Sequence, residues 1–181
     1  MVKKEIIIGV TASVACYKAI DVISGLRKLG VNVTVILTKE AEEFIKPVLF
    51  QVVSGNRAIT HDIFSPPPDE WDVAHVSLAE KADCVAIIPA TANIIAKIAN
   101  GICDDMLTCA VCATKAPVLF APAMNTFMYN NKIVRANIDK LKKFGYHFTG
   151  PIKGRLACGA KGLGHIQGSE VIIKEVRRLI G

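Results

Sequence analysis

The amino-acid sequence predicts an α/β fold, in which helices cover both faces of one parallel sheet. Short, almost continuously apolar runs alternate along the chain with segments of helical composition. This alternation is typical of parallel strands that are buried on both faces. No internal repeat, linker or shift in composition divides the 181 residues. We therefore expect a single domain that spans residues 1–181.

The first half of the chain is expected to form two strand–helix units. These are a strand at 5–9, a helix at 14–29 that ends at Gly30, a strand at 31–37 and a helix at 39–45 that Pro47 ends. A connecting region follows at 48–71. Its three consecutive prolines, 66–68, exclude a helix and favour an extended surface segment.

The second half continues the alternation. We expect a strand at 83–88, helices at 94–99 and 106–114, a strand at 118–120, a basic helix at 132–144, a short strand at 147–149 and an amphipathic helix at 170–180. This arrangement defines a Rossmann/flavodoxin-like, doubly wound parallel sheet.

Charge and composition exclude several classes of protein. The formal charge of +6 comes from scattered lysines rather than from a basic stripe, so we expect no nucleic-acid partner. No apolar run is long enough to cross a bilayer, and no signal sequence opens the chain, so we expect a cytoplasmic protein. Cys109 and Cys112 form a CxxC, but no second ligand pair follows. We therefore expect buried thiols there and no metal, with a zinc or redox site as the alternative.

Three predicted strands end in small or hydrogen-bonding residues. Gly9–Ser13 follows the first strand, Thr38–Lys39 the second, and Pro89–Asn93 the third. The first turn suits an anion, but the sequence has no GxGxxG and no acidic residue at the end of the second strand. The pattern therefore favours a mononucleotide over a dinucleotide. The alternative is that these hydroxyls and Asn93 only cap helices.

A fourth strand end, 121–125, delivers Asn125 into an expected loop that also holds residues 126–128. This amide could bind a polar ligand or could simply cap a turn. His75 precedes the third strand and is the most plausible general base, although a lone histidine is more often structural.

A glycine-rich stretch near the end of the chain is expected to be a mobile substrate lid, at about 152–166. Arg155 gives it positive charge, and Cys158 is the one cysteine outside an apolar run. This thiol could act as a proton donor or a nucleophile. The alternative is a surface loop with an incidental cysteine.

These features together resemble the homo-oligomeric, flavin-dependent cysteine decarboxylases. The matching stretches are His75, PATANIIAKIANGICDDMLT (89–108), APAMNTFMYNN (121–131) and RLACG (155–159). The resemblance implies a flavoprotein in which FMN and substrate are bound by a set of residues along the sheet edge. For FMN these are Ala12, Ser13, Val14, Thr38, Lys39, Thr91, Ala92, Asn93, Ile94 and Ala123.

The resemblance also implies the chemistry. His75, Asn125 and Cys158 would be catalytic, with Cys158 as the proton donor on the lid; Asn125, Met128 and Arg155 would bind the substrate. The expected reaction is oxidative decarboxylation of 4′-phosphopantothenoylcysteine to 4′-phosphopantetheine, in coenzyme A biosynthesis. The expected assembly is a homotrimer, or a dodecamer of trimers, with FMN between subunits. This chain would correspond to the decarboxylase half, with phosphopantothenate–cysteine ligase as a separate partner.

Two other functions remain open within the same resemblance. One is a peptidyl-cysteine decarboxylase, against which the RLACG lid argues, and the other is a non-catalytic flavin-binding regulatory subunit. The chain departs from the family pattern at 165–168, where His-Ile-Gln-Gly replaces Met-Ala-Glu-Pro. This departure leaves the closed form of the lid open.

Overall fold

The computed structural model describes residues 3–62 and 74–181. The strands are β1 (Glu5–Val10), β2 (Asn32–Leu37), β3 (Cys84–Ala90), β4 (Val118–Pro122), β5 (His147–Phe148), β6 (Ile152–Arg155) and β7 (Lys161–His165). The helices are η1 (Val14–Cys16), α1 (Tyr17–Lys28), α2 (Ala41–Phe44), α3 (Pro47–Ser54), α4 (Ala74–Lys81), α5 (Ala92–Ala99), α6 (Met106–Ala113), α7 (Thr126–Asn130), α8 (Lys132–Lys143) and α9 (Ser169–Ile180).

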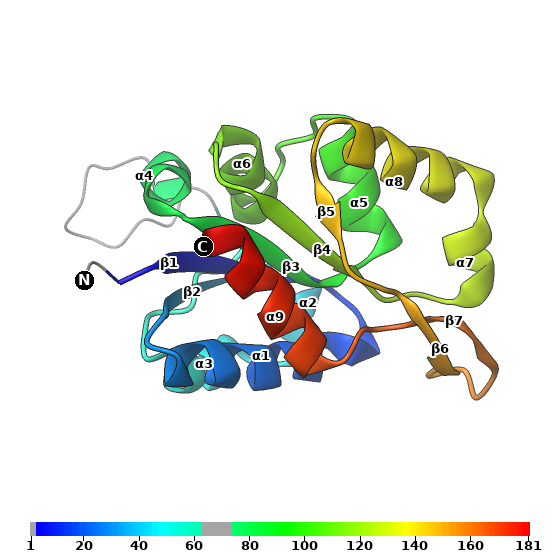
Figure 1. The fold of residues 1–181 in the computed structure, drawn as a ribbon, viewed down its shortest axis with the longest axis horizontal. Coiled ribbons are helices and arrows are strands. Elements are labelled where there is room, and N and C mark those ends of the chain that lie inside the picture. Colours follow the sequence, from blue (N-terminus) through cyan, green and yellow to red (C-terminus); the bar gives the residue numbers. More distant parts are fainter. Residues whose placement is uncertain (1–2, 63–73) are drawn as a thin grey trace.

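The first five strands form one parallel sheet in the order β2-β1-β3-β4-β5. This order confirms the doubly wound, flavodoxin-like sheet. Helices α1, α3 and α9 cover one face, and α4, α5, α6 and α8 lie over the other (Figure 1). The remaining strands, β6 and β7, pair antiparallel and extend beyond the sheet edge as a separate hairpin.

Alternation along β1 divides the core between the two faces. Ile6 and Ile8 pack into the cluster that contains the side chains of α1 and α9. Ile7, which lies between them, packs into the cluster beneath α5, α6 and α8. Because every residue of β3 is buried, this strand reads as a continuous apolar run in the sequence.

Several segments differ from the sequence predictions, among which α3, α4, β6 and β7 were not predicted as helices or strands. Pro47 does not end a helix but occupies the first turn of α3, where its missing N–H costs no hydrogen bond. The expected helix at 14–29 begins with a single 3-10 turn, η1. Residues 126–128, which were expected in a loop, belong to α7. The prediction for the three prolines at 66–68 lies outside the described residues.

Within the described part of the chain, no helix is long and apolar enough to span a membrane.

Candidate functional site

One buried hydroxyl joins the loops that follow β1 and β3. Thr11 Oγ1 donates to the carbonyl of Pro89 at 2.7 Å and accepts from the N–H of Thr91 at 3.3 Å. Thr11 as a whole is only 2 % exposed. These loops lie where the direction of winding changes between β1 and β3, which is the usual ligand position in an open α/β sheet.

A cavity of about 430 Å³ opens at this point. We call it the edge cavity, and its lining residues are Thr11, Ala12, Ser13, Thr38, Glu40, Thr91, Asn93, Ile94, Lys97, Asp105, Ala123, Met124 and Met128. Seven of the predicted FMN residues are therefore brought together in one place. Two hydroxyls there are already used as helix caps, because Ser13 Oγ accepts from Ala15 N and Thr91 Oγ1 from Ile94 N, both at 3.3 Å.

Three charged residues of the edge cavity were not predicted from the sequence. Lys97 forms ion pairs with Asp104 at 2.8 Å and with Asp105 at 3.5 Å, and Glu40 lies nearby in the lining. Burial alone would lower the pKa of Lys97, but the hydrogen bonds and charges of the two carboxylates outweigh it and leave that pKa raised. Lys97 is thus a paired cation. Asp105 could have been found from the sequence as the N-cap of α6, where it forms a capping box with Thr108.

Asn125 has two functions in the structure, one at each end of its amide. Its Oδ1 accepts from the N–H of Phe127 at 2.8 Å and so caps α7. Its Nδ2 donates to Sγ of Cys158 at 3.7 Å. The structure therefore confirms the cap, whereas the interpretation of Asn125 as a donor to a ligand stays a prediction.

The stretch at 152–166 is a hairpin rather than an irregular glycine-rich loop. Its strands pair from Ile152 with His165 to Arg155 with Lys161, and the turn closes through Leu156 N and the carbonyl of Ala160 at 2.8 Å. Cys158 lies in that turn and is exposed.

Close packing explains the glycines of β7 better than flexibility does. A Cβ at Gly162 would collide with Oγ1 of Thr126, and one at Gly164 would collide with the carbonyl oxygen of Met124. Gly164 also has a φ of +150°, and its carbonyl accepts from Met124 N at 3.1 Å. Thr126 Oγ1 is buried there without a hydrogen-bond partner among the described residues. Close approach therefore accounts for these two glycines of β7, and the mobile lid at about 152–166 stays a prediction.

A second cavity of about 490 Å³ lies between this hairpin and the start of α1. We call it the hairpin cavity, and its lining residues are Ser13, Val14, Ala15, Tyr17, Ala123, Met124, Asn125, Arg155, Leu156, Ala157, Cys158, Gly164, His165 and Ile166. It shares Ser13, Ala123 and Met124 with the edge cavity. A ligand in one cavity would therefore touch the wall of the other.

Several predicted site residues lie elsewhere. His75 is half-buried in the first turn of α4, which packs against α6, and it lines neither cavity. Lys39 and Ala92 also line neither cavity, and Met128, which was expected at the substrate, lines the edge cavity. Val14, which was expected at FMN, lines the hairpin cavity.

The prediction that Cys109 and Cys112 are buried was wrong, because Cys109 is half-buried and Cys112 is exposed. Met106, Leu107, Ala110 and Val111 occupy the buried face of α6 and leave both thiols on its other side. Burial and a hydrogen bond with Cys112 raise the pKa of Cys103 to about 11, which disfavours a reactive thiolate. The described residues contain no group of three side chains arranged to hold a metal.

A sheet of this strand order, with a cavity at its β1–β3 switch point, defines a flavodoxin-like α/β protein whose site suits a mononucleotide. The chain matches the flavoprotein family over residues 1–181, and it belongs to that family.

Two curated relatives have extensive similarity to the chain. It is 43% identical over 173 residues to the coenzyme A biosynthesis bifunctional protein CoaBC of Borreliella burgdorferi, covering 94% of this chain and 43% of the relative. It is 39% identical over 175 residues to a probable phosphopantothenoylcysteine decarboxylase of Streptococcus mutans, covering 96% and 97%. The chain thus spans less than half the length of its bifunctional relatives but nearly all of the streptococcal one.

Solved structures show the same fold. A mutant of PPC decarboxylase, in complex with pantothenoylaminoethenethiol, superposes with a TM-score of 0.86 at 29% identity, covering 98% of both chains. The FMN-dependent cysteine decarboxylase SpaF superposes with a TM-score of 0.83 at 29% identity, also covering 98% of both chains.

Proposed function

We propose that this protein decarboxylates 4′-phosphopantothenoylcysteine oxidatively, with FMN, to give 4′-phosphopantetheine in coenzyme A biosynthesis. The flavoprotein family and the streptococcal relative, which this chain matches over nearly its whole length, support this proposal. The observation that carries it is the contact between Asn125 Nδ2 and Cys158 Sγ in a cavity that shares a wall with the edge cavity.

The edge cavity fits FMN. Its volume lies within the range of small-molecule sites, and its lining combines the hydroxyls of Thr11, Ser13 and Thr91 with apolar groups such as Ile94 and Ala123. Lys97 is the one basic residue among the described residues that line the edge cavity, and it is paired with two aspartates, so binding of the FMN phosphate would depend on hydroxyl and backbone donors. Bound FMN would supply the two-electron oxidation of the cysteine thiol and the later two-electron reduction of the enethiol that remains after CO₂ leaves.

The side chains of the hairpin cavity suit the remaining steps. A carboxylate at Asn125 would accept a hydrogen bond from Nδ2, which orients it without placing a negative charge against it. Loss of CO₂ leaves an enethiol, which needs both a hydride, the reduction that bound FMN would supply, and one proton on carbon to become a saturated thiol. The Cys158 thiol is next to Asn125 and can donate that proton. We propose that the hairpin turn closes over the cavity during this step.

His75 requires a different explanation, because within one chain it lines neither cavity. We propose that the active unit is an oligomer, a trimer or an assembly of trimers, in which His75 of one copy completes the site of the next. The half-buried side chain in the first turn of α4 is accessible enough to be shared in this way. There it would assist proton movement at the substrate.

Incubation of the purified protein with FMN and phosphopantothenoylcysteine tests the proposed reaction. We expect equal amounts of CO₂ and phosphopantetheine, and a yellow protein with one flavin per chain. Release of CO₂ with accumulation of the enethiol would instead indicate the peptidyl-cysteine type of decarboxylase. Flavin binding without any CO₂ would indicate a regulatory subunit.

Mixing two inactive variants tests the shared site. His75→Asn and Asn125→Asp should each be inactive alone. If the two residues of one site come from different copies, about one quarter of the sites in a randomly mixed assembly carry both native residues. Activity should then return after the two variants are unfolded and refolded together. No recovery in verified mixed assemblies would place both residues in one copy.

The wider cellular setting follows the same proposal. We propose a cytoplasmic enzyme with a phosphopantothenate–cysteine ligase as its functional partner, because the longer relatives are named as bifunctional proteins of coenzyme A biosynthesis.

A further inference from the structure

The hairpin cavity has an unbalanced charge. Among the described residues that line it, Arg155 and His165 are the two that can carry positive charge, and none is acidic. Asn125 and Cys158 account for the reacting end of the proposed substrate, but they leave its phosphate without a partner. A buried or partly buried phosphate needs cationic or hydrogen-bonding groups.

The imidazole of His165 is fixed in one orientation. Its Nδ1 lies 3.1 Å from the carbonyl oxygen of Arg155. Because a carbonyl only accepts, Nδ1 must carry the hydrogen, and Nε2 is the free nitrogen. The ring also packs over Gly154, where a Cβ would come within 2.8 Å of the ring carbon Cγ. No described residue forms a hydrogen bond with Nε2.

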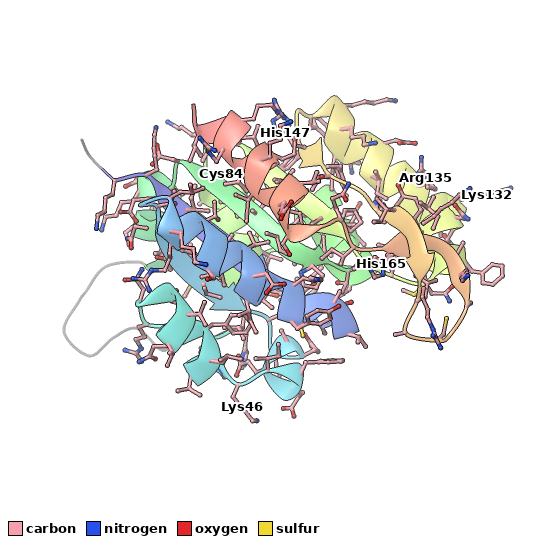
Figure 2. All side chains as sticks on the ribbon, turned by 60° about the horizontal axis from the view of Figure 1, so that its bottom comes forward. Lys46, Cys84, Lys132, Arg135, His147 and His165 are labelled. Atoms are coloured by element: carbon pink, nitrogen blue, oxygen red, sulfur yellow. The ribbon has the colours of Figure 1, made fainter. Side chains whose placement is uncertain are left out.

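His165 stands at the anchored end of the hairpin. The neighbouring Gly164 accepts a hydrogen bond from Met124 N at 3.1 Å, which joins this end of β7 to the strand end after β4. Figure 2 shows His165 at the base of the hairpin, where it meets the rest of the fold. Arg155, by contrast, is exposed beside the turn. His165 is therefore a preformed contact, whereas Arg155 can adjust to a ligand.

We infer that Nε2 of His165, together with the guanidinium of Arg155, binds the phosphate group of the substrate and makes the enzyme selective for the phosphorylated form. This inference rests on the proposed function. Because Nδ1 already donates to the carbonyl of Arg155, one proton must lie between Nε2 and the phosphate: either Nε2–H donates to a phosphate oxygen, or a phosphate hydroxyl donates to Nε2. The resulting hydrogen bond is charge-assisted.

The surroundings of His165 favour the same ligand. On the paired strand β6 the ionisable groups are Lys153 and Arg155, and on its own strand the group is Lys161. Helix α7, which packs against β7, carries no ionisable side chain except that of the buried Tyr129. The groups that surround the imidazole are thus cations or neutral, which stabilises a bound dianion.

The test compares phosphopantothenoylcysteine with pantothenoylcysteine as substrates. His165→Phe retains a planar ring over Gly154 but has no ring nitrogen. We expect it to lower kcat/KM for the phosphorylated substrate by about 10- to 100-fold, to change kcat/KM for the unphosphorylated one less than about twofold, and to leave the flavin spectrum intact. His147→Phe is the matched control, because His147 on β5 lines neither cavity. It should leave both values unchanged.

Two outcomes would overturn the inference. An equal loss with both substrates would give His165 a structural role, and a loss of FMN affinity with an unchanged substrate preference would assign it to the cofactor. His165→Gln serves as a second variant if the phenylalanine does not fold. If the wild-type protein converts neither substrate, the proposed function fails. The phosphate site is then tested by calorimetry with phosphopantetheine and pantetheine, whose affinities should differ in the wild type and converge in His165→Phe.

Discussion

The edge cavity and the hairpin cavity share a wall but are built in different ways. The edge cavity is formed by loops that directly follow buried strands, and the Thr11 hydroxyl ties two of these loops together. The hairpin cavity depends on a peripheral hairpin that packs on α7 through glycines. The first is an extension of the core, whereas the second rests on a few close contacts. We therefore expect changes in the hairpin cavity to affect turnover and changes at the edge to affect cofactor affinity.

The largest expected effect is that of Asn125→Asp. A carboxylate can still accept from Phe127 N and cap α7, but it places a negative charge against the substrate carboxylate. Two like charges about 4 Å apart repel by about 4 kcal/mol at an effective dielectric constant of 20, so we expect decarboxylation to slow by about 1,000-fold while FMN stays bound. CO₂ release measures this effect.

Asn131→Asp is the control for that substitution. Asn131 caps α8 in the same way, with Oδ1 accepting from Ile133 N at 2.9 Å, but it lines neither cavity. It should retain normal turnover. Normal turnover in Asn125→Asp as well would show that its amide does not face the carboxylate.

Cys158→Ser should separate decarboxylation from the final protonation. A hydroxyl of similar size donates a proton far less readily than a thiol, so we expect formation of phosphopantetheine to slow by about 100-fold. The first turnover should still release CO₂, and the enethiol should accumulate with the flavin reduced. Mass spectrometry of the products and flavin absorbance measure both. An unchanged yield of phosphopantetheine would remove Cys158 from the mechanism.

Gly164→Ala tests how the hairpin is held. The added methyl group would overlap the carbonyl oxygen of Met124, so the hairpin must move or the backbone must strain. We expect the free energy of unfolding to fall by about 1–3 kcal/mol, with a larger loss of turnover than of FMN affinity. Gly168→Ala is the control, because nothing lies within 4 Å of a Cβ there. Urea denaturation compares the two, and equal stability would show that the close approach is not rigid.

The smallest expected effect belongs to the edge cavity. Thr11→Val keeps the shape of the side chain but leaves the carbonyl of Pro89 and the N–H of Thr91 without their shared partner. We expect a loss of about 1–2 kcal/mol in stability and weaker FMN binding, with near-normal turnover when FMN is saturating. Thr34→Val on β2 is the control, and fluorescence titration with FMN is the measurement. A turnover defect that saturating FMN does not correct would contradict the expectation that the edge cavity affects cofactor affinity and the hairpin cavity affects turnover.

The sequence predicted the sheet and the edge cavity well for one physical reason. Parallel strands buried on both faces are continuously apolar, and their carboxyl ends must meet along one edge. Position alone therefore brought Ser13, Thr38 and Thr91 together. Helix α3 was missed because Pro47 was interpreted as a stop, although proline is equally suited to a first helical turn.

The hairpin cavity was less predictable, because it depends on contacts between distant segments. A glycine needed for close approach, such as Gly162 against Thr126, looks the same in a sequence as a glycine needed for flexibility. The expected role of His75 raises a further problem, since one chain does not place it at either cavity. His165 had no distinguishing context in the sequence. Only the hairpin pairing and its bond to Arg155 place it at the cavity wall.

The side-chain amide of Asn125 makes two different hydrogen bonds, which limits the residue types that this position can tolerate. Its oxygen is committed to the backbone of α7, and its nitrogen faces Cys158. Aspartate, serine and threonine would keep a capping oxygen but lose the amide donor, and glutamine would carry a donor on a side chain one carbon too long to cap in the same way. Of the twenty residue types, asparagine alone meets both requirements. Random mutagenesis with selection for activity should therefore return the wild-type codon here far more often than at Asn131, where the cap is the single requirement.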